Sequence, residues 1–347
     1  GGHGRTGVHG TDEDEARRTA GEDVGRVVAI ALLRAAIGHD RHAERGGVPV
    51  GGLLGVAHGE HDRVHPLDGE RVGGDGGDVR SCMAAWAKLM KGKRGLVMGV
   101  ANERSIAWGI AKALADEGAE LAFSYQGDAF GKRVEPLAAS VGSDFLVDVD
   151  VTNDDSLEAC FGTLKDRWGT MDFLVHAIAF SDKNELTGRF INTSRANFSN
   201  SLAISCFSFI DVSRRAAELM PNGGTLITLT YGGSNRVTPN YNVMGVAKAA
   251  LESATRYLAN DLGPQQVRVN AISPGPMKTL AGAAIGGARA TFRHTEANAP
   301  MRANATLEAI GGTAVWLCSD YGNCTTGEVV HVDCGFHVLG MPQQDNL

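Results

Sequence analysis

Between residues 94 and 332 the chain alternates short apolar runs with longer segments of helical pattern, and this alternation limits the fold more than any other feature. Apolar runs of about four to eight residues, bounded by turn residues, predict buried strands. Strands that alternate with helices predict β–α–β units and a parallel sheet covered on both faces. We therefore predict a single-domain, doubly wound α/β fold of the Rossmann type. The predicted strands are 94–100, 120–125, 145–151, 171–177, 224–229, 267–272 and 327–332, and the predicted helices are 106–116, 154–168, 194–220, 241–260 and 306–317.

Residues 1–82 differ from the rest of the chain in composition. They contain no Lys, Met, Phe, Tyr, Trp, Asn or Gln, but they hold seven of the eleven His residues. Without aromatic residues, such a segment buries too little apolar surface to offset the entropy lost when it orders. We therefore predict a disordered extension over 1–82, followed by the folded domain over 83–347.

Three interpretations of this extension compete. Its His residues would suit metal binding, and its basic residues would suit a transit peptide, but irregular spacing argues against the first and acidic residues against the second. We expect instead that residues 1–82 are translated upstream sequence and that the functional start is Met83 or Met90.

Charge and cysteine content argue against several classes of protein. The net charge of −7 favours neither nucleic acid nor an anionic membrane as a partner. No apolar run approaches the roughly 18 residues of a membrane-spanning helix. The six Cys residues show neither paired short spacing nor His neighbours, so we predict reduced thiols in a cytoplasmic protein without a metal site.

Tyr241 and Lys248 are the strongest candidates for chemistry. They lie seven residues apart at the start of a predicted helix, and seven steps of about 100° return to nearly the same face. A phenol is a weak acid with a pKa of about 10, and a nearby ammonium group eases its ionisation. The pair therefore suits proton donation to a substrate oxygen, although the same spacing also occurs on ordinary surface helices.

The sequence around this pair is more specific than its spacing. Tyr231 precedes Tyr241 by ten residues, and Tyr241 opens the run Tyr-Asn-Val-Met-Gly-x-Ala-Lys, which ends at Lys248. This string resembles the short-chain dehydrogenases and, within them, the bacterial NADH-dependent enoyl-acyl-carrier-protein reductases, over residues 83–341. The resemblance implies reduction of a trans-2-enoyl thioester on acyl carrier protein, the final reductive step of bacterial fatty acid elongation. It also implies a homotetramer.

The same resemblance assigns roles to the residues of the motif. Tyr241 would hydrogen-bond the enolate oxygen of the substrate, and Lys248 would hold the nicotinamide ribose and support Tyr241. Tyr231 would assist at the substrate, and Ser181 is a further substrate residue by the same comparison.

The first strand, turn and helix have the pattern of a phosphate-binding entrance. Gly99 ends the strand run, and Ser105 and Ile106 open the helix. Glycine lets the backbone approach a pyrophosphate, and the helix N-terminus supplies free N–H groups. The common G-x-G-x-x-G pattern is absent, so an ordinary glycine turn is an alternative. The divergent form Gly-Val-Ala-x-x-x-Ser-Ile-Ala-x-Gly resembles the enoyl reductases.

Gln126 follows the second predicted strand, where the chain is expected to meet the adenosine ribose. An acid there would require a free 2′-OH and an arginine would accept a 2′-phosphate, whereas Gln126 is neutral. By resemblance we predict NADH, with NADPH as an alternative because Lys132 and Arg133 follow closely. Asp150 and Val151 resemble the family's adenine contact, although Asp150 would also suit a cap of the following helix.

The fourth predicted strand ends in the run His-Ala-Ile-Ala-Phe, from His176 to Phe180. By resemblance, Ile178 lies along the cofactor. We expect the His176 imidazole to be bonded by the backbone rather than to act chemically. Ala179 stands where the family usually has Gly, and its methyl group would project toward the nicotinamide pocket. We therefore expect normal turnover but less room for flat inhibitors stacked on the nicotinamide.

The resemblance places five more cofactor contacts after the sixth strand. Residues 279–298, rich in Ala and Gly, are predicted to form a mobile substrate lid. Ala288 replaces the bulky aromatic of relatives, and only Arg289 and Arg293 are basic, so the affinity for the carrier protein is an open question. Cys334 is a further departure, from a usual Gly. The five contacts are Met277, Lys278, Thr279, Leu280 and Ala281, with Thr279 at the phosphates.

Two other functions are compatible with this fold. A short-chain carbonyl or 3-oxoacyl reductase would usually carry Ser about 13 residues before the catalytic Tyr. Thr228 stands at that position, and Tyr231 matches the enoyl reductases instead. A nucleotide-sensing protein without catalysis would not need both Tyr241 and Lys248.

Overall fold

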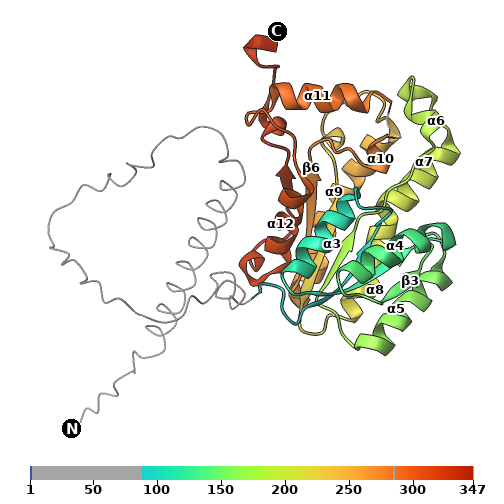
Figure 1. Ribbon diagram of the computed structural model, residues 1–347, viewed down its shortest axis with the longest axis vertical. Helices are drawn as coiled ribbons and strands as arrows, with labels where there is room; N and C mark the ends of the chain where they lie inside the picture. Colours follow the sequence, from blue (N-terminus) through green and yellow to red (C-terminus); the bar gives the residue numbers. More distant parts are fainter. Residues whose placement is uncertain (2–87, 284–285, 347) are drawn as a thin grey trace, which may run out of the picture. The chain divides into compact units, whose positions relative to one another are not determined.

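The computed structural model describes residues 1, 88–283 and 286–346 (Figure 1). Apart from Gly1, the segment 1–82 lies outside the described residues, and so do the predictions made for it. The labels below are those of Figure 1, in which the helix numbering of the described part begins at α3.

All seven predicted strands are present, and they form one parallel sheet. The strands are β1 (Arg94–Met98), β2 (Glu120–Tyr125), β3 (Leu146–Asp148), β4 (Phe173–His176), β5 (Gly224–Leu229), β6 (Val267–Pro274) and β7 (Val329–Val332). Their order is β3-β2-β1-β4-β5-β6-β7, which confirms the doubly wound fold. The order reverses between β1 and β4, and sheets of this kind bind their ligands at the carboxyl ends of the strands at that point.

Helices cover both faces of the sheet. They are α3 (Ile106–Asp116), α4 (Asp128–Ser140), α5 (Asp154–Trp168), α6 (Lys183–Leu186), α7 (Arg195–Leu202), α8 (Ser208–Glu218), α9 (Val243–Leu262), α10 (Leu280–Ala283), α11 (Ala288–Asn298) and α12 (Leu307–Cys318). Leu96 and Met98 of β1 belong to a core shared with α5, α8 and α9, whereas Val97 between them belongs to a core shared with α3, α4 and α12. This alternation follows from the period of two along a strand.

Several predicted bounds coincide with the structure. The predicted helices 106–116 and 154–168 are α3 and α5, and the predicted strand 224–229 is β5. The predicted helix 194–220 is a helical stretch in which a π-helical segment, Ala203–Phe207, joins α7 to α8. The predicted helix 241–260 begins later than expected, at Val243, so Tyr241 lies outside α9.

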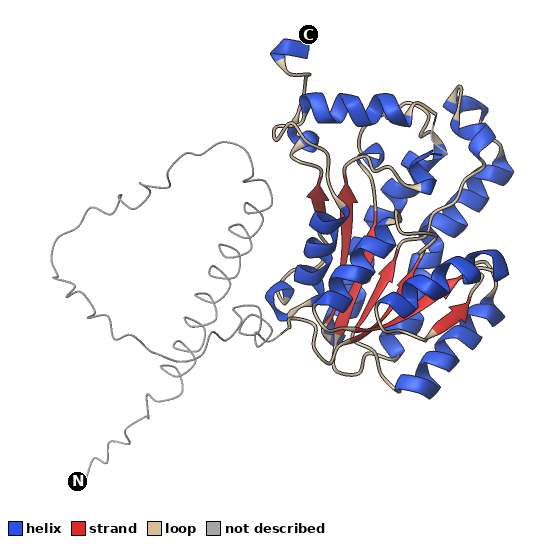
Figure 2. Cartoon of the chain, viewed as in Figure 1, coloured by secondary structure: helices blue, strands red, loops and turns tan. Residues whose placement is uncertain are grey.

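Three helices lie at one end of the sheet. Figures 1 and 2 show α6, α10 and α11 beyond the carboxyl ends of the strands. The described residues of the predicted lid therefore lie at the end of the sheet where ligands of this fold bind.

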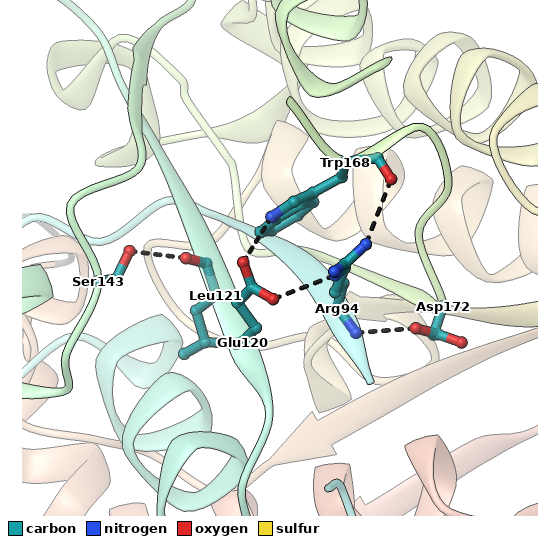
Figure 3. Close-up of polar contacts among 6 residues, drawn as sticks. All are labelled: Arg94, Glu120, Leu121, Ser143, Trp168 and Asp172. Atoms are coloured by element: carbon teal, nitrogen blue, oxygen red, sulfur yellow. Dashed lines mark hydrogen bonds and ion pairs between the residues drawn. The ribbon is translucent and has the colours of Figure 1, made fainter. Parts of the chain in front are cut away.

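At the opposite, amino end of the sheet, polar side chains form a network of hydrogen bonds (Figure 3). Glu120 accepts hydrogen bonds from Arg94 Nε at 3.0 Å and from Trp168 Nε1 at 2.7 Å. Asp172 accepts the main-chain N–H of Arg94 at 2.8 Å, and the Arg94 guanidinium donates to the Trp168 carbonyl at 3.3 Å. These contacts join the first residues of β1 and β2 to the end of α5 and the start of β4.

Candidate active site

Two aromatic side chains and a lysine meet at the carboxyl end of β5. Tyr231 follows this strand, Tyr241 lies in the loop before α9, and Lys248 lies in the second turn of α9. The rings of Tyr231 and Tyr241 contact edge to face, with centroids 5.1 Å apart and planes at 65°. Tyr241 and Lys248 are each only 6% exposed. The three residues predicted to be catalytic therefore converge on one strand end, and two of them are buried.

Tyr241 is presented by a loop rather than by a helix, which corrects the helical-spacing argument. Asn240 and Asn242 have φ of 60° and 38°, in the left-handed region. Asparagine enters this region more readily than most residues because its short polar side chain bonds locally. A Cβ at Gly233 would lie 2.5 Å from Cδ1 of Tyr241, so glycine leaves room for the ring there. Tyr241 thus reaches Tyr231 through a backbone turn and not through two turns of helix.

The two asparagines also tie the Tyr241 loop to its surroundings. Asn240 Nδ2 donates to the Gly286 carbonyl at 2.7 Å. Asn242 Nδ2 donates to the carbonyls of Glu185 and Gly188, both at 3.3 Å. Neither asparagine was identified from the sequence, where the only signal was an asparagine on each side of the candidate tyrosine.

Lys248 is held by the main chain of the neighbouring strand. Its ammonium group donates to the Leu229 carbonyl at 2.7 Å. Burial lowers the pKa of Lys248 to about 8, while the neighbouring Cys206 and Glu252 act in the opposite direction. Lys248 is therefore predominantly an ammonium ion at neutral pH, and its position is set by the end of β5.

The hydroxyl of Tyr241 is a weaker acid than the sequence led us to expect. Burial raises the pKa of Tyr241, and the neighbouring Tyr231 and Glu252 add to the increase. Burial also raises the pKa of Tyr231. The prediction that Lys248 lowers the pKa of Tyr241 is wrong, because desolvation of the phenolate dominates. Tyr241 is thus a neutral phenol at physiological pH, suited to donate a hydrogen bond.

His176 is fully buried and bonded by two side-chain hydroxyls. Its Nδ1 lies 3.2 Å from Thr228 Oγ1 and its Nε2 lies 2.8 Å from Ser208 Oγ. Burial lowers the pKa of His176 to about 3, with a further contribution from Lys248. The ring is therefore neutral and structural. The facing strand and helix supply these two hydroxyls, and a hydrogen bond with the backbone of His176 itself acts against the lowering of its pKa.

Thr228 occupies the position where carbonyl reductases usually carry a serine. Its hydroxyl is buried, contacts His176 Nδ1, and also lies 3.3 Å from the His176 carbonyl oxygen. The Thr228 hydroxyl is thus engaged in the core between β4 and β5 and is withdrawn from Tyr241.

The predicted phosphate-binding turn has the geometry that an anion needs. Gly99 has φ of 97°, and a Cβ there would lie 2.2 Å from the Ala177 carbonyl oxygen, so only glycine fits between β1 and β4. The Ser105 hydroxyl accepts hydrogen bonds from two main-chain amides of the turn at 3.0 and 3.1 Å and does not cap α3. The first-turn N–H groups of α3, from Ile106 onward, are thus left without a side-chain cap.

The predicted adenosine side lies at the carboxyl ends of β2 and β3, where Gln126 is exposed. Asp150 accepts hydrogen bonds from the hydroxyl and main-chain N–H of Thr152 at 2.6 and 2.9 Å. These bonds lower the pKa of Asp150, and the Gln126 side chain contributes in the same direction. Asn153 caps α5, so Asp150 does not cap this helix. Val151, beside it, is partly buried against the core below α5.

The loop after β4 carries two further predicted residues. Ile178 packs against the core shared with α5, α8 and α9. The Ser181 hydroxyl donates to Asn197 Oδ1 at 3.2 Å. Between them, the main chain of Phe180 is held by Ser205, whose Oγ lies 3.0 Å from the Phe180 nitrogen and 3.1 Å from its oxygen. Ser205 belongs to the π-helical segment, and such segments are frequent at functional sites.

The predicted contacts after β6 take different positions. Met277 packs against the core shared with α3 and α12, whereas Lys278 is exposed with its Nζ 4.3 Å from the Phe292 ring centroid. Thr279 Oγ1 accepts the N–H of Gly282 at 2.9 Å, which leaves its own proton free for another acceptor. Leu280 is exposed at the start of α10. Ala281 belongs to α10, but its side chain lies outside the described part.

Three departures from the family's usual residues fall at this end of the sheet. Ala179 is exposed, and Ala288 is the partly buried first residue of α11. Cys334 has φ of 57°, in the left-handed region that glycine adopts without strain. The structure thus explains why glycine suits position 334, and nothing in it explains the cysteine.

Two absences apply to the described part of the chain. Within residues 88–283 and 286–346, no group of His, Cys, Asp and Glu side chains is arranged to hold a metal ion. Among the helices of the same segments, none has both the length and the apolar character needed to cross a membrane.

Comparisons with known proteins show the family to which the chain belongs. A family model described as Enoyl-(Acyl carrier protein) reductase matches residues 99–337. The chain is 59% identical over 259 residues to enoyl-acyl-carrier-protein reductase (NADH) 2 of Rhizobium meliloti (strain 1021), and the match covers 75% of this chain and 97% of that relative.

Solved structures extend the likeness to three dimensions. The enoyl-acyl-carrier-protein reductase of Anaplasma phagocytophilum in complex with NAD is 52% identical with a TM-score of 0.72, covering 74% of this chain and 98% of that chain. The Bacillus cereus enzyme with NADP+ and indole naphthyridinone is 48% identical with a TM-score of 0.72, covering 73% of this chain and 100% of that chain.

Proposed function

Because the chain belongs to the enoyl-(acyl carrier protein) reductase family, we propose that it reduces the carbon–carbon double bond of trans-2-enoyl groups on acyl carrier protein with NADH. This reaction is the final reductive step of bacterial fatty acid elongation. The observation that supports it most is the buried Tyr241 in contact with Tyr231, at the strand end that also anchors Lys248.

The chain's own residues fit a dinucleotide at the carboxyl end of the sheet. Gly99 permits the close backbone approach that a pyrophosphate needs, and the uncapped N-terminus of α3 supplies N–H donors. Gln126, Asp150 and Val151 would hold the adenosine half. Ile178 and the segment 277–281 would hold the nicotinamide half. When bound, NADH supplies the hydride for the β-carbon of the substrate.

Tyr241 would stabilise the charge that develops on the substrate. Addition of hydride to the β-carbon moves negative charge onto the thioester oxygen. A neutral phenol held in a dry site can donate a hydrogen bond to that oxygen, and such a preorganised donor stabilises the transition state more than the ground state. Tyr231, packed against the Tyr241 ring, would limit its rotation and face the acyl group.

Lys248 would orient the cofactor and favour negative charge nearby. One of its three N–H donors is engaged by the Leu229 carbonyl, and the other two remain for the hydroxyls of the nicotinamide ribose. Its positive charge also favours an enolate beside Tyr241.

One observation argues against the carbonyl reductase alternative. Such an enzyme needs a hydroxyl beside the catalytic tyrosine, but the Thr228 hydroxyl is buried against His176. Reduction of a double bond conjugated to a thioester requires only the Tyr241 donor at the oxygen. The nucleotide-sensing alternative gives no reason for a buried Tyr241 near an anchored ammonium group.

The proposed partners are acyl carrier protein and further copies of this chain. Arg289 and Arg293 are exposed on α11 and would meet an acidic carrier. Ile210 on α8 and Val246 and Tyr257 on α9 expose apolar side chains on neighbouring helices, as subunit interfaces do. We propose that the protein is a cytoplasmic homotetramer. Its mass in solution can be measured by light scattering after size exclusion, and the mass of a monomer would contradict the tetramer.

A substrate comparison tests the proposed function. Purified protein should oxidise NADH with crotonyl thioester and leave acetoacetyl thioester unchanged, followed by the loss of NADH absorbance. The opposite preference would establish a carbonyl reductase, and no turnover with either thioester would refute both enzymes.

A further inference from the structure

The adenosine side of the site has an acidic residue, Asp148, at the end of β3 instead of directly after β2. In this fold the side chain after the second strand faces the adenosine ribose, and an acid there selects a free 2′-OH over a 2′-phosphate. Gln126 occupies that position and carries no charge. Selection between NADH and NADPH must therefore come from another side chain.

Asp148 is fixed beside this position by two strands. β2 and β3 pair so that Tyr125 lies opposite Asp148, and Val149 donates its N–H to the Tyr125 carbonyl at 2.7 Å. Asp148 Oδ1 accepts the N–H of Gly127 at 2.8 Å. Gly127 directly follows Gln126 and has φ of 73° at the start of α4. The Asp148 carboxylate is thus bonded to the residue next to the one that meets the ribose.

Asp148 forms no ion pair within the part of the chain that the structure describes. Arg133 of α4 lies over the Phe130 ring, with 5.9 Å between its Cζ and the ring centroid. Asp150, near Gln126, adds a second negative charge on the same side. Asp148 and Asp150 therefore place two carboxylates at this strand end.

We propose that Asp148 makes this enzyme select NADH over NADPH, an inference that rests on the proposed function because it needs the dinucleotide bound at this sheet edge. A 2′-phosphate beside Gln126 would add about two negative charges next to the Asp148 carboxylate. At separations of several ångströms near the surface, this repulsion corresponds to at least about a tenfold loss of affinity. A free 2′-OH carries no such penalty.

Asp148 could instead act only by holding the Gly127 turn, and Asp148→Asn separates the two roles. The amide oxygen of Asn accepts the Gly127 N–H as the carboxylate does, but the side chain is neutral. Asp148→Ala removes both the acceptor and the charge. Asp166→Asn, at an exposed position near the end of α5, makes the same change in net charge far along the chain from Gly127.

Equilibrium binding tests the inference without turnover. The dissociation constants of NADH and NADPH would be measured by titration calorimetry for the wild type and the three variants. We expect Asp148→Asn to lower the NADPH-to-NADH ratio of dissociation constants about tenfold, with NADH affinity within twofold of wild type, and Asp166→Asn to leave the ratio unchanged. An unchanged ratio in Asp148→Asn would overturn the proposal, as would an equal change in Asp166→Asn.

The remaining variant and the salt dependence sharpen the result. If Asp148→Ala alone changed the ratio, the Gly127 turn and not the charge would be responsible, and the proposal would be overturned. A charge effect should also shrink from 0.05 to 0.5 M salt in the wild type. Turnover of crotonyl thioester by the wild type separates failure of the proposed reductase function from failure of the role of Asp148. If the wild type does not oxidise NADH with this substrate, the function is refuted. If it does, and the ratio of dissociation constants is unchanged in Asp148→Asn, only the role of Asp148 is refuted.

Discussion

At the amino end of the sheet Arg94, Glu120 and Trp168 bond to one another, whereas at the carboxyl end the Tyr241 hydroxyl bonds to no residue that the structure describes. The backbone is also irregular at the carboxyl end and regular at the amino end. Asn240 and Asn242 hold left-handed conformations around Tyr241, while the first residues of β1 and β2 are regular strand.

This contrast separates two uses of polar side chains. Groups that satisfy one another stabilise the fold, so their removal should lower the free energy of unfolding. Groups held in place without a partner stabilise little, and their removal should affect what binds there. The following predictions test whether stability and activity divide between the two ends of the sheet in this way.

Tyr241→Phe should produce the largest effect, a loss of at least about a hundredfold in kcat/KM, because it deletes the hydrogen bond to the developing oxyanion. The ring remains, so the thermal midpoint should change little. Steady-state NADH oxidation and a thermal melt measure both quantities. Tyr321→Phe, at an exposed position after α12, is the matched control and should retain activity. Full turnover by Tyr241→Phe would remove this hydroxyl from the mechanism.

The pH dependence of NADH affinity should be the next largest effect. The pKa of Lys248 is lowered to about 8 by burial, so its charge is present below that pH and is lost above it. Loss of the ammonium donor should raise the dissociation constant of NADH by up to about tenfold between pH 7 and pH 9. Fluorescence titration across this range measures the change. Lys248→Arg keeps its charge, and an identical inflection in that variant would assign the titration to another group.

At the amino end, Glu120→Gln should lower the free energy of unfolding by about 1 kcal/mol without changing kcat/KM. The amide can accept only one of the two hydrogen bonds from Arg94 and Trp168, and its NH₂ group then faces the other donor. Urea denaturation measures the difference. Asp116→Asn, in the exposed pair with Lys112, is the control and should cost at most about 0.5 kcal/mol. A loss of activity in Glu120→Gln at unchanged stability would contradict the division between the two ends.

The smallest expected effect is a gain of about 0.5 kcal/mol in stability for Cys334→Gly. Relief of the left-handed strain exceeds the extra entropy that glycine loses on folding. Urea denaturation detects it, with Cys334→Ala as the control that keeps the strain. A lower free energy of unfolding for Cys334→Gly would show that packing of the cysteine side chain stabilises the fold by more than the left-handed strain destabilises it.

Much of the fold was predictable because its signals are local. Apolar runs marked all seven strands, and the bounds of α3, α5 and β5 matched the prediction. The glycine turn at Gly99 and the tyrosine–lysine motif likewise follow from residue type and spacing. The start of α9 was missed because Asn240 and Asn242 take up left-handed conformations that no periodicity reveals.

The sequence by itself determined the alternation of strands and helices, the glycine turn at Gly99, and the choice of Tyr231, Tyr241 and Lys248 as candidates. Only the tertiary structure decided the direction of the Tyr241 pKa, the hydroxyl partners of His176 and the place of Asp148 beside Gly127. Periodicity and turn chemistry act between neighbours along the chain, whereas burial and charge depend on residues that are distant in sequence and meet only when the sheet has formed.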